Sequence, residues 1–395
     1  MPTRIFHGGT IVLPDKLLDG GAVCVEDGRI SAVHPSICHP PPQAEGIDLQ
    51  GGYLTPGFVD LHVHGGGGAD FMDGTKEAFR TVCRAHARHG TTSLLPTTTA
   101  ARHEQHLAFL GICRQLKNAA TGASILGAHF YGPYFAREAR GCHPAAPVRP
   151  PRPEEYRAYL EYADSICTAT VAPELPGAEA FVRDCIKAGI RCNAGHSYAT
   201  FEQMEAAVAW GVRHVDHLFC AMSDRARLRQ TQTYPMRGGV MEATLYFDDL
   251  TTEVIADGKH LRRELLLLAY KVKGPDRLAL VTDCNRALDM PDGEYMFGPR
   301  DGGEPIRRAD GVGMMPDGTA LASGVMGMDH MLRTFLHLTG APLVDVVRMA
   351  TLTPARIAGR EREIGSIAVG KRADLVVLDS NLEVRDVYPA GQAIE

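Results

Sequence analysis

The stretch Phe58-Val-Asp-Leu-His62-Val-His64-Gly65 decides how the rest of the chain is interpreted. Its apolar residues and the preceding Pro56-Gly57 indicate a short buried strand. Side chains two positions apart on a strand point to the same face, so His62 and His64 leave the strand together. Two such imidazoles can share a metal ion; the alternative is a buried strand with two hydrogen-bonded histidines. The four glycines at 65–68 predict an open mouth beside the pair.

Beyond this stretch, apolar strand-like runs alternate with amphipathic helical patterns, which is typical of repeated βα units and a parallel sheet. Eight strands are predicted, at 58–64, 91–97, 125–131, 168–173, 191–196, 214–219, 252–256 and 278–283. Helices are predicted at 76–89, 103–118, 153–163, 178–188, 201–210, 262–272, 329–338 and 343–358. This pattern predicts an α/β fold, a (β/α)8 TIM barrel.

Both ends of the chain differ from this pattern, because residues 1–55 and 360–395 show short strands with tight turns. Asp27-Gly28, for example, is a hairpin signal between two apolar runs. We expect the two ends to form one small β-sandwich domain beside a catalytic barrel at 56–359. The irregular section 291–324 is too long for a simple loop and is expected to form hairpins near the barrel mouth.

Composition narrows the class of protein. Of the 395 residues, 45% are hydrophobic and 22% are charged, as in an ordinary water-soluble enzyme. The net charge of -6 gives no electrostatic reason to expect nucleic acid or an anionic membrane as a partner. The N-terminus shows no signal-peptide core, and the apolar runs are too short to span a bilayer. The ten cysteines include no Cys-x-x-Cys pair, which favours reduced thiols and a cytoplasmic location.

Ionisable side chains recur at the carboxyl ends of the predicted strands, where barrel enzymes place their functional groups. The set consists of His62, His64, His196, His217, His260 and Asp283. Unrelated core histidines would not be expected to fall so regularly at one end of successive strands. The set therefore predicts a divalent metal centre, and imidazoles with one carboxylate suit zinc best.

A metal centre of this composition points to hydrolysis of an amide. The ion lowers the pKa of a water molecule and polarises a carbonyl group. Asp283 can accept the water proton and later pass it to the leaving nitrogen. The sequence shows no Gly-x-Ser-x-Gly elbow, no Walker loop and no dinucleotide fingerprint, so the other common chemistries of α/β enzymes are not favoured.

At this level the chain resembles the amidohydrolase superfamily and, within it, the N-acetylglucosamine-6-phosphate deacetylase family. The motifs that carry the resemblance are Pro56 to Gly65, Gly132-Pro133, Ala194-Gly-His-Ser197, His217-Leu-Phe-Cys-Ala-Met222, Ile255-Ala-Asp-Gly-Lys-His260, Leu280-Val-Thr-Asp283, Ala322-Ser-Gly324, Met349 to Ala355 and Gly365 to Asp374. They span nearly the whole chain in the family's order. The resemblance implies a homodimer that removes acetate from an acetylated amino sugar phosphate.

The resemblance also implies residue roles. His196 and His217 would bind the metal, and Asp283 would be the general base. The residues implied in substrate binding are His143, Cys220, Ala221, Met222, Arg227 and His260. Arg227 is one of three arginines at 225–229, and the motif does not decide which of them would meet phosphate in the partner subunit. A solvated basic loop is the alternative for this segment.

Two positions depart from the family pattern. Tyr131 stands where the strand-three motif His-x-Glu-Gly-Pro has its metal-binding glutamate. Three outcomes are open: the ion shifts to a centre of His62, His64, His196 and Asp283; another carboxylate, Glu138 or Glu174, reaches in; or the protein is catalytically weak. We favour the first, because both histidines of the opening stretch are present. At the second position, Cys220 replaces an asparagine that helps to hold the phosphate.

These departures leave three hypotheses about function. The first is a metal-dependent hydrolase that removes the acetyl group from an amino sugar phosphate resembling N-acetylglucosamine 6-phosphate. The second is a related single-metal amidohydrolase that acts on another small amide or cyclic amide. The third is a catalytically weak relative that binds sugar phosphate. Metal content measured together with acetate release separates them.

Overall fold

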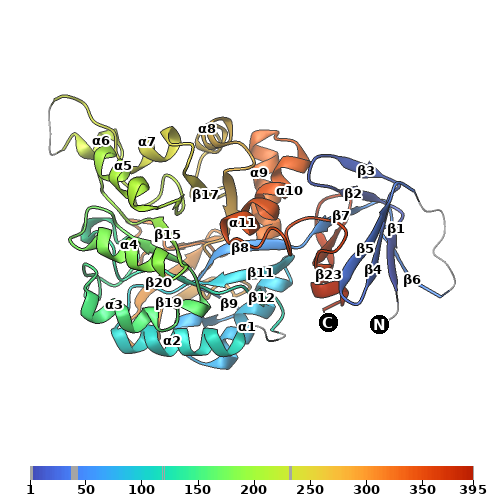
Figure 1. The fold of residues 1–395 in the computed structure, drawn as a ribbon, viewed down its shortest axis with the longest axis horizontal. Coiled ribbons are helices and arrows are strands. Elements are labelled where there is room, and N and C mark those ends of the chain that lie inside the picture. The colour runs from blue at the N-terminus through green and yellow to red at the C-terminus, as the bar shows by residue number, and fades with distance from the viewer. Residues whose placement is uncertain (1–2, 37–42, 118, 120, 231–233, 395) are drawn as a thin grey trace.

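A curled parallel sheet forms the larger part of the molecule in the computed structural model, which describes residues 3–36, 43–117, 119, 121–230 and 234–394 (Figure 1). Six strands pair in the order β13-β14-β15-β16-β17-β18, and three in the order β12-β11-β8. The strands are β8 (Phe58–Val63), β11 (Thr91–Pro96), β12 (Ser124–Ile125), β13 (Ala128–Phe130), β14 (Ile166–Val171), β15 (Arg191–Ala194), β16 (His214–Val215), β17 (Thr251–Ile255) and β18 (Leu278–Val281). The predicted parallel βα architecture is confirmed.

Parallel bridges link the two sheets at both of their margins. Val63 pairs with Cys284 at one margin, and Thr97 pairs with His129 at the other. The Asp283 amide also donates to the His62 carbonyl at 3.0 Å. The carboxyl end of β8 therefore lies beside the carboxyl end of β18, which brings the first and the last predicted site residues together.

Two predicted strands differ most from the strands of the structure. The predicted strand at 125–131 is divided into β12 and β13 around Gly127, whose φ of 148° is open to glycine and rarely to other residues. The predicted strand at 214–219 ends at Val215. The chain then turns sharply, with positive φ at His217, Phe219 and Ala221, and this turn carries the following side chains toward the site.

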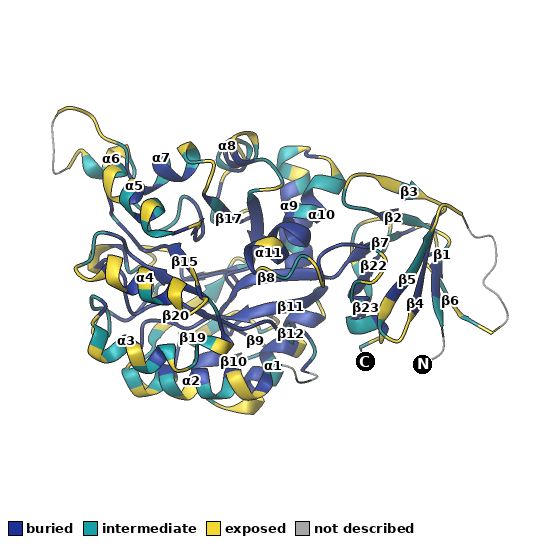
Figure 2. Ribbon diagram, in the orientation of Figure 1, coloured by how far each residue is buried: buried dark blue, intermediate teal, exposed yellow. Residues whose placement is uncertain are grey.

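Helices cover the outside of the sheet, with their exposed faces turned away from it (Figure 2). They are α1 (Lys76–Ala87), α2 (His103–Leu116), α3 (Pro153–Leu160), α4 (Ala178–Lys187), α5 (Phe201–Trp210), α6 (Arg225–Leu228), α7 (Val240–Tyr246), α8 (Arg263–Lys273), α9 (Met328–Thr339), α10 (Leu343–Ala350) and α11 (Leu352–Ile357), with 3-10 turns at Phe71–Asp73, Arg137–Ala139, Ala163–Ser165 and Pro389–Gly391. The single helix predicted at 343–358 is wrong. It is two helices that meet at Thr351, because Pro354 has no N–H for the carbonyl of Ala350.

The two ends of the chain share a sheet. Strand β22 pairs antiparallel with β7, and Leu375 lies opposite Pro56 in that register. One terminal sheet has the order β5-β4-β1-β6 and the other has the order β23-β22-β7-β2-β3. Their strands are β1 (Arg4–His7), β2 (Thr10–Val12), β3 (Leu17–Asp19), β4 (Ala22–Glu26), β5 (Arg29–His34), β6 (Glu45–Asp48), β7 (Tyr53–Pro56), β22 (Leu375–Leu378) and β23 (Val384–Tyr388).

The section at 291–324 forms hairpins, as the sequence predicted. Strands β19 (Gly293–Phe297), β20 (Glu304–Ala309) and β21 (Val312–Met314) pair in an antiparallel sheet. A smaller hairpin, β9 (Gly65–Gly66) with β10 (Ala69–Asp70), follows β8 directly. In the parts of the chain that the structure describes, no helix has the length and apolarity needed to cross a membrane.

Candidate metal centre and active site

A cavity of about 310 Å³ opens at the carboxyl ends of the parallel strands. Nine of the predicted site residues line it: His64, Tyr131, His143, His196, His217, Cys220, Ala221, His260 and Asp283. His62 is fully buried at its edge. Of the predicted residues, Met222 and Arg227 do not reach the described wall of this cavity. The structure thus brings together side chains that lie more than 200 positions apart in the sequence.

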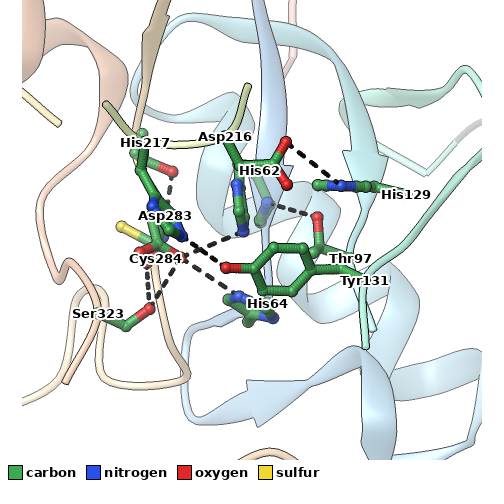
Figure 3. Close-up of polar contacts among 12 residues, drawn as sticks. His62, His64, Thr97, His129, Tyr131, Asp216, His217, Asp283, Cys284 and Ser323 are labelled. Atoms are coloured by element: carbon green, nitrogen blue, oxygen red, sulfur yellow. Dashed lines mark hydrogen bonds and ion pairs between the residues drawn. The ribbon is translucent and has the colours of Figure 1, made fainter. Parts of the chain in front are cut away.

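The group formed by His62, His64 and Asp283 has the geometry of a cation site (Figure 3). One ligand atom of each lies within 4.8 Å of the other two. Asp283 Oδ1 is 3.6 Å from His62 Nε2 and 3.3 Å from His64 Nε2. Within the described residues, His62 Nε2 and His64 Nδ1 are buried without a hydrogen-bond partner. A neutral imidazole has one nitrogen without a proton that can bind a cation, so two histidines with one carboxylate fit a bound ion.

Glu253, on β17, holds the His62 ring in position. The sequence analysis did not find this residue. Its Oε1 lies 2.7 Å from His62 Nδ1, and its Oε2 lies 3.2 Å from His214 Nε2. A carboxylate on one ring nitrogen fixes the tautomer and the orientation of a histidine, so that the other nitrogen faces the metal. The available signal was a glutamate in the middle of a buried strand, where an ionised side chain requires a partner.

We expect Glu253→Ala to lower the affinity for the metal, while the other residues of the cavity remain. Loss of an outer carboxylate typically lowers metal affinity about 10- to 100-fold. The measurement is a competition titration with a chelator above pH 9, where most of the His62 rings have lost the competing proton. Glu138→Gln is the matched control, since Glu138 lines the same cavity and lies outside the His62 group. Equal affinity of both variants would show that Glu253 does not position His62.

The charges of His62 and Asp283 shift the pKa of each other. Burial alone would lower the pKa of His62, but Asp283 and Glu253 outweigh burial and raise it to about 9. Burial would raise the pKa of Asp283, yet His62 and His64 hold it well below its ordinary value. Asp283 therefore remains a carboxylate, and its Oδ1 accepts a hydrogen bond from Ser323 Oγ at 3.0 Å. At neutral pH the metal-free His62 ring is therefore an imidazolium with a proton on each nitrogen. Metal binding to one nitrogen releases the proton from it.

Tyr131 lies at the centre of the predicted histidines. Its hydroxyl oxygen is 2.5 Å from Nε2 of His217, a residue that the resemblance predicts to bind metal. Burial, followed by the nearby Asp283 and Asp216 carboxylates, raises the pKa of the phenol well above its ordinary value of 10. The phenol therefore stays neutral, and a neutral phenol is a poor replacement for a glutamate ligand. Burial also lowers the pKa of His217 to about 4.

The two alternative carboxylates occupy different places. Glu174 accepts hydrogen bonds from Ser197 Oγ and from the Tyr198 amide, both at 2.6 Å, and so anchors the loop after β15. Glu138 lines the cavity but belongs to neither of the described carboxylate and histidine groups that could hold a cation. His196 points its other nitrogen inward, because its Nδ1 donates to the Ala139 carbonyl at 2.6 Å.

Four of the residues expected to meet the substrate line the same cavity: His143, Cys220, Ala221 and His260. His260 is fixed by Asp257, whose Oδ2 lies 2.7 Å from His260 Nδ1. The turn that carries Cys220 and Ala221 faces the cavity from the end of β16. The Arg227 guanidinium stacks over the Tyr198 ring, 4.3 Å from the ring centroid, and Tyr198 itself lines the cavity. Phe297 and Cys142 also line it, and the sequence analysis singled out neither.

The chain is similar in sequence to a known family and to several known proteins. The amidohydrolase family is matched by residues 53–394. The chain is 31% identical, over 99% of both sequences, to N-acetylgalactosamine-6-phosphate deacetylase of Escherichia coli O157:H7. It is 31% identical to N-acetylglucosamine-6-phosphate deacetylase of Bacillus subtilis, over 95% of this chain and 92% of that protein.

Solved structures agree with these matches. N-acetylglucosamine-6-phosphate deacetylase from Pasteurella multocida superposes with a TM-score of 0.92 at 30% identity, over 99% of both chains. A variant of the Mycobacterium smegmatis enzyme, in complex with N-acetyl-D-glucosamine-6-phosphate, superposes with a TM-score of 0.90 at 30% identity, over 100% of this chain and 99% of that one. The similarity therefore includes the strands that carry the site and both ends of the chain.

Proposed function

Because the chain belongs to the amidohydrolase family and, within it, to the N-acetylglucosamine-6-phosphate deacetylases, we propose that it hydrolyses the N-acetyl amide of an amino sugar phosphate and releases acetate. The observation that carries the proposal is the group of His62, His64 and Asp283 at the cavity. Two imidazoles, when neutral, and one carboxylate can bind an ion there. The carboxylate can also accept and donate a proton.

We assign the divalent ion, zinc by the chemistry of its donors, to His62, His64 and Asp283, with His196 as a further candidate ligand. Bound there, the ion would supply Lewis acidity toward water and the amide carbonyl. The contact between Tyr131 and His217 supports this position over one at His196 and His217, because the contact occupies Nε2 of His217. The proposal thus follows the first of the three outcomes for Tyr131.

Asp283 performs the proton transfers. Its carboxylate accepts a proton from the attacking water and later delivers it to the amide nitrogen as the carbon–nitrogen bond breaks. Ser323 orients the carboxylate by its hydrogen bond to Oδ1. We assign the sugar and its phosphate to His143, His260, Cys220 and Ala221, which line the cavity, and to the backbone beside Met222 in the turn after β16. Arg227 is the arginine of its segment that we assign to phosphate, in the partner subunit of a homodimer.

The direct test combines metal analysis with acetate release from a panel of substrates. We expect about one zinc ion per chain and acetate from N-acetylglucosamine 6-phosphate or N-acetylgalactosamine 6-phosphate. The unphosphorylated N-acetyl sugars are the matched controls and should react more slowly, because they lack the phosphate. A metal-loaded protein that releases no acetate from any of them would contradict the proposal.

One observation favours a second candidate function. Among the described residues that line the cavity there is no lysine or arginine. An uncharged small amide or cyclic amide would fit such a wall without a phosphate partner. Release of a carboxylic acid from amides outside the sugar panel, with the same metal content, would support this related activity. A metal-free protein that still bound sugar phosphate would instead indicate the catalytically weak relative.

We also propose the division of the chain that the sequence predicted. Residues 56–359 would form a closed (β/α)8 barrel, and 1–55 with 360–395 a small β-sandwich domain. The bridges between the two parallel sheets and the pairing of β22 with β7 support this division. A cytoplasmic location is consistent with the nine free thiols among the described cysteines.

A further inference from the structure

The surrounding atoms define which residue donates the hydrogen bond between Tyr131 and His217. His217 Nδ1 is buried and has no hydrogen-bond partner within the described residues. A neutral imidazole carries its proton on one nitrogen, and a buried N–H is left unpaired less often than a buried acceptor. The proton therefore belongs on Nε2, which donates it to the Tyr131 oxygen at 2.5 Å. The hydroxyl hydrogen of Tyr131 is then free to donate to another group.

Tyr131 is also held rigidly. Its backbone amide donates to Thr98 Oγ1 at 2.7 Å, and Thr98 Oγ1 donates back to its carbonyl at 2.8 Å. The rings of His62 and Phe135 pack against its ring, with centroids 4.5 Å and 4.8 Å away. The hydroxyl therefore occupies a fixed point in the cavity wall, close to the group of His62, His64 and Asp283 (Figure 3). A fixed donor in a water-poor site stabilises developing negative charge without reorganisation.

We propose that the Tyr131 hydroxyl is a catalytic hydrogen-bond donor that binds the carbonyl oxygen of the scissile amide, with His217 as the residue that positions it. This inference rests on the proposed function and assigns a role to the side chain that replaces the family's glutamate. The phenol supplies by hydrogen bonding a part of the charge stabilisation that a second cation would give.

The reaction balances with this assignment. The oxygen of water bonds to the carbonyl carbon while Asp283 takes one of its protons, and the carbonyl electron pair moves onto the oxygen that faces Tyr131. When the pair returns, the carbon–nitrogen bond breaks and Asp283 gives its proton to the nitrogen. The products are acetic acid, which ionises, and the free amine. Tyr131 keeps its proton throughout and only strengthens its hydrogen bond at the charged stage.

Tyr131→Phe tests the inference, because it removes only the hydroxyl. We expect kcat to fall about 10²- to 10³-fold while KM and metal content stay near those of the unmodified protein. Affinity for an analogue with a tetrahedral phosphonamidate in place of the acetamide should fall by a similar factor, since that group imitates the charged stage. Tyr134→Phe is the matched control: Tyr134 is equally buried, but its hydroxyl donates to Glu155 at 2.9 Å and it does not line the cavity.

The outcomes separate two failures. Unchanged kcat in Tyr131→Phe, in a protein that releases acetate, would overturn this inference alone. Altered metal content in Tyr131→Phe would also overturn it, because Tyr131 would then act on the metal and not on the amide. No acetate release by the unmodified, metal-loaded protein would overturn the proposed function and this inference with it. Loss of kcat and of analogue affinity at constant metal content supports the inference.

Discussion

Asp283→Asn is expected to lower acetate release about 10⁴-fold and to leave most of the affinity for the substrate intact. The asparagine keeps the shape of the side chain and one oxygen ligand, but its amide cannot accept the water proton. Asp283 is the carboxylate of the group that also contains His62 and His64, and it stays ionised beside them. The loss should therefore appear in kcat much more than in KM.

The measurement is steady-state acetate release, together with equilibrium binding of the substrate and metal analysis of the same sample. Metal analysis is required because Asp283 is both a proposed ligand and the proposed base. Asp289→Asn is the matched control: it makes the same chemical change in a side chain that pairs with Arg88 and His89 outside the cavity. Normal turnover by Asp283→Asn would remove Asp283 from the mechanism.

His62→Ala is expected to take the metal content from about one ion per chain to almost none. Among the described residues, His62 Nε2 is buried without a hydrogen bond and lies 3.6 Å from Asp283 Oδ1, and Glu253 fixes the ring through Nδ1. His217→Ala should keep the ion, because Nε2 of His217 contacts the Tyr131 hydroxyl. The two variants remove the same chemical group, so the comparison reports the position of the ion directly.

Elemental analysis after dialysis against a chelator-free buffer gives the result, with circular dichroism to check that each variant is folded. Tyr131→Glu completes the comparison, since a carboxylate at this position should allow a second ion to bind with His196 and His217. The assignment would be wrong if His62→Ala kept its metal and His217→Ala lost it. The ion would then occupy the family's usual position in spite of Tyr131.

Much of the fold followed from the sequence, because its signals were local and periodic. The alternation of apolar runs with helical patterns predicted the parallel strands. The errors occurred where backbone geometry depended on a single residue. Gly127 divides one strand and Pro354 divides one helix, and neither effect is visible in the hydrophobic period.

The sequence predicted most of the residues that form the site, but not which of their atoms contact one another. Histidines at strand ends were found because a predicted barrel places such positions at one mouth. Glu253 was missed because its importance comes from two partners, His62 and His214, which lie 191 and 39 positions away. The sequence also showed that Tyr131 was unusual but not which nitrogen it would meet, since this depends on how the turn after β16 is bent.

The pairing of the two ends of the chain has a consequence for synthesis. Only Gly57 separates β7 from β8, the strand that carries His62, and the Gly57 amide donates to the Asp374 carbonyl. β7 gains its β22 neighbour only after residue 378 has left the ribosome, so this anchor of the catalytic strand forms late in translation. Until then, the side of β7 that β22 later covers is a strand edge with unpaired N–H and C=O groups, a template for wrong pairing with another chain.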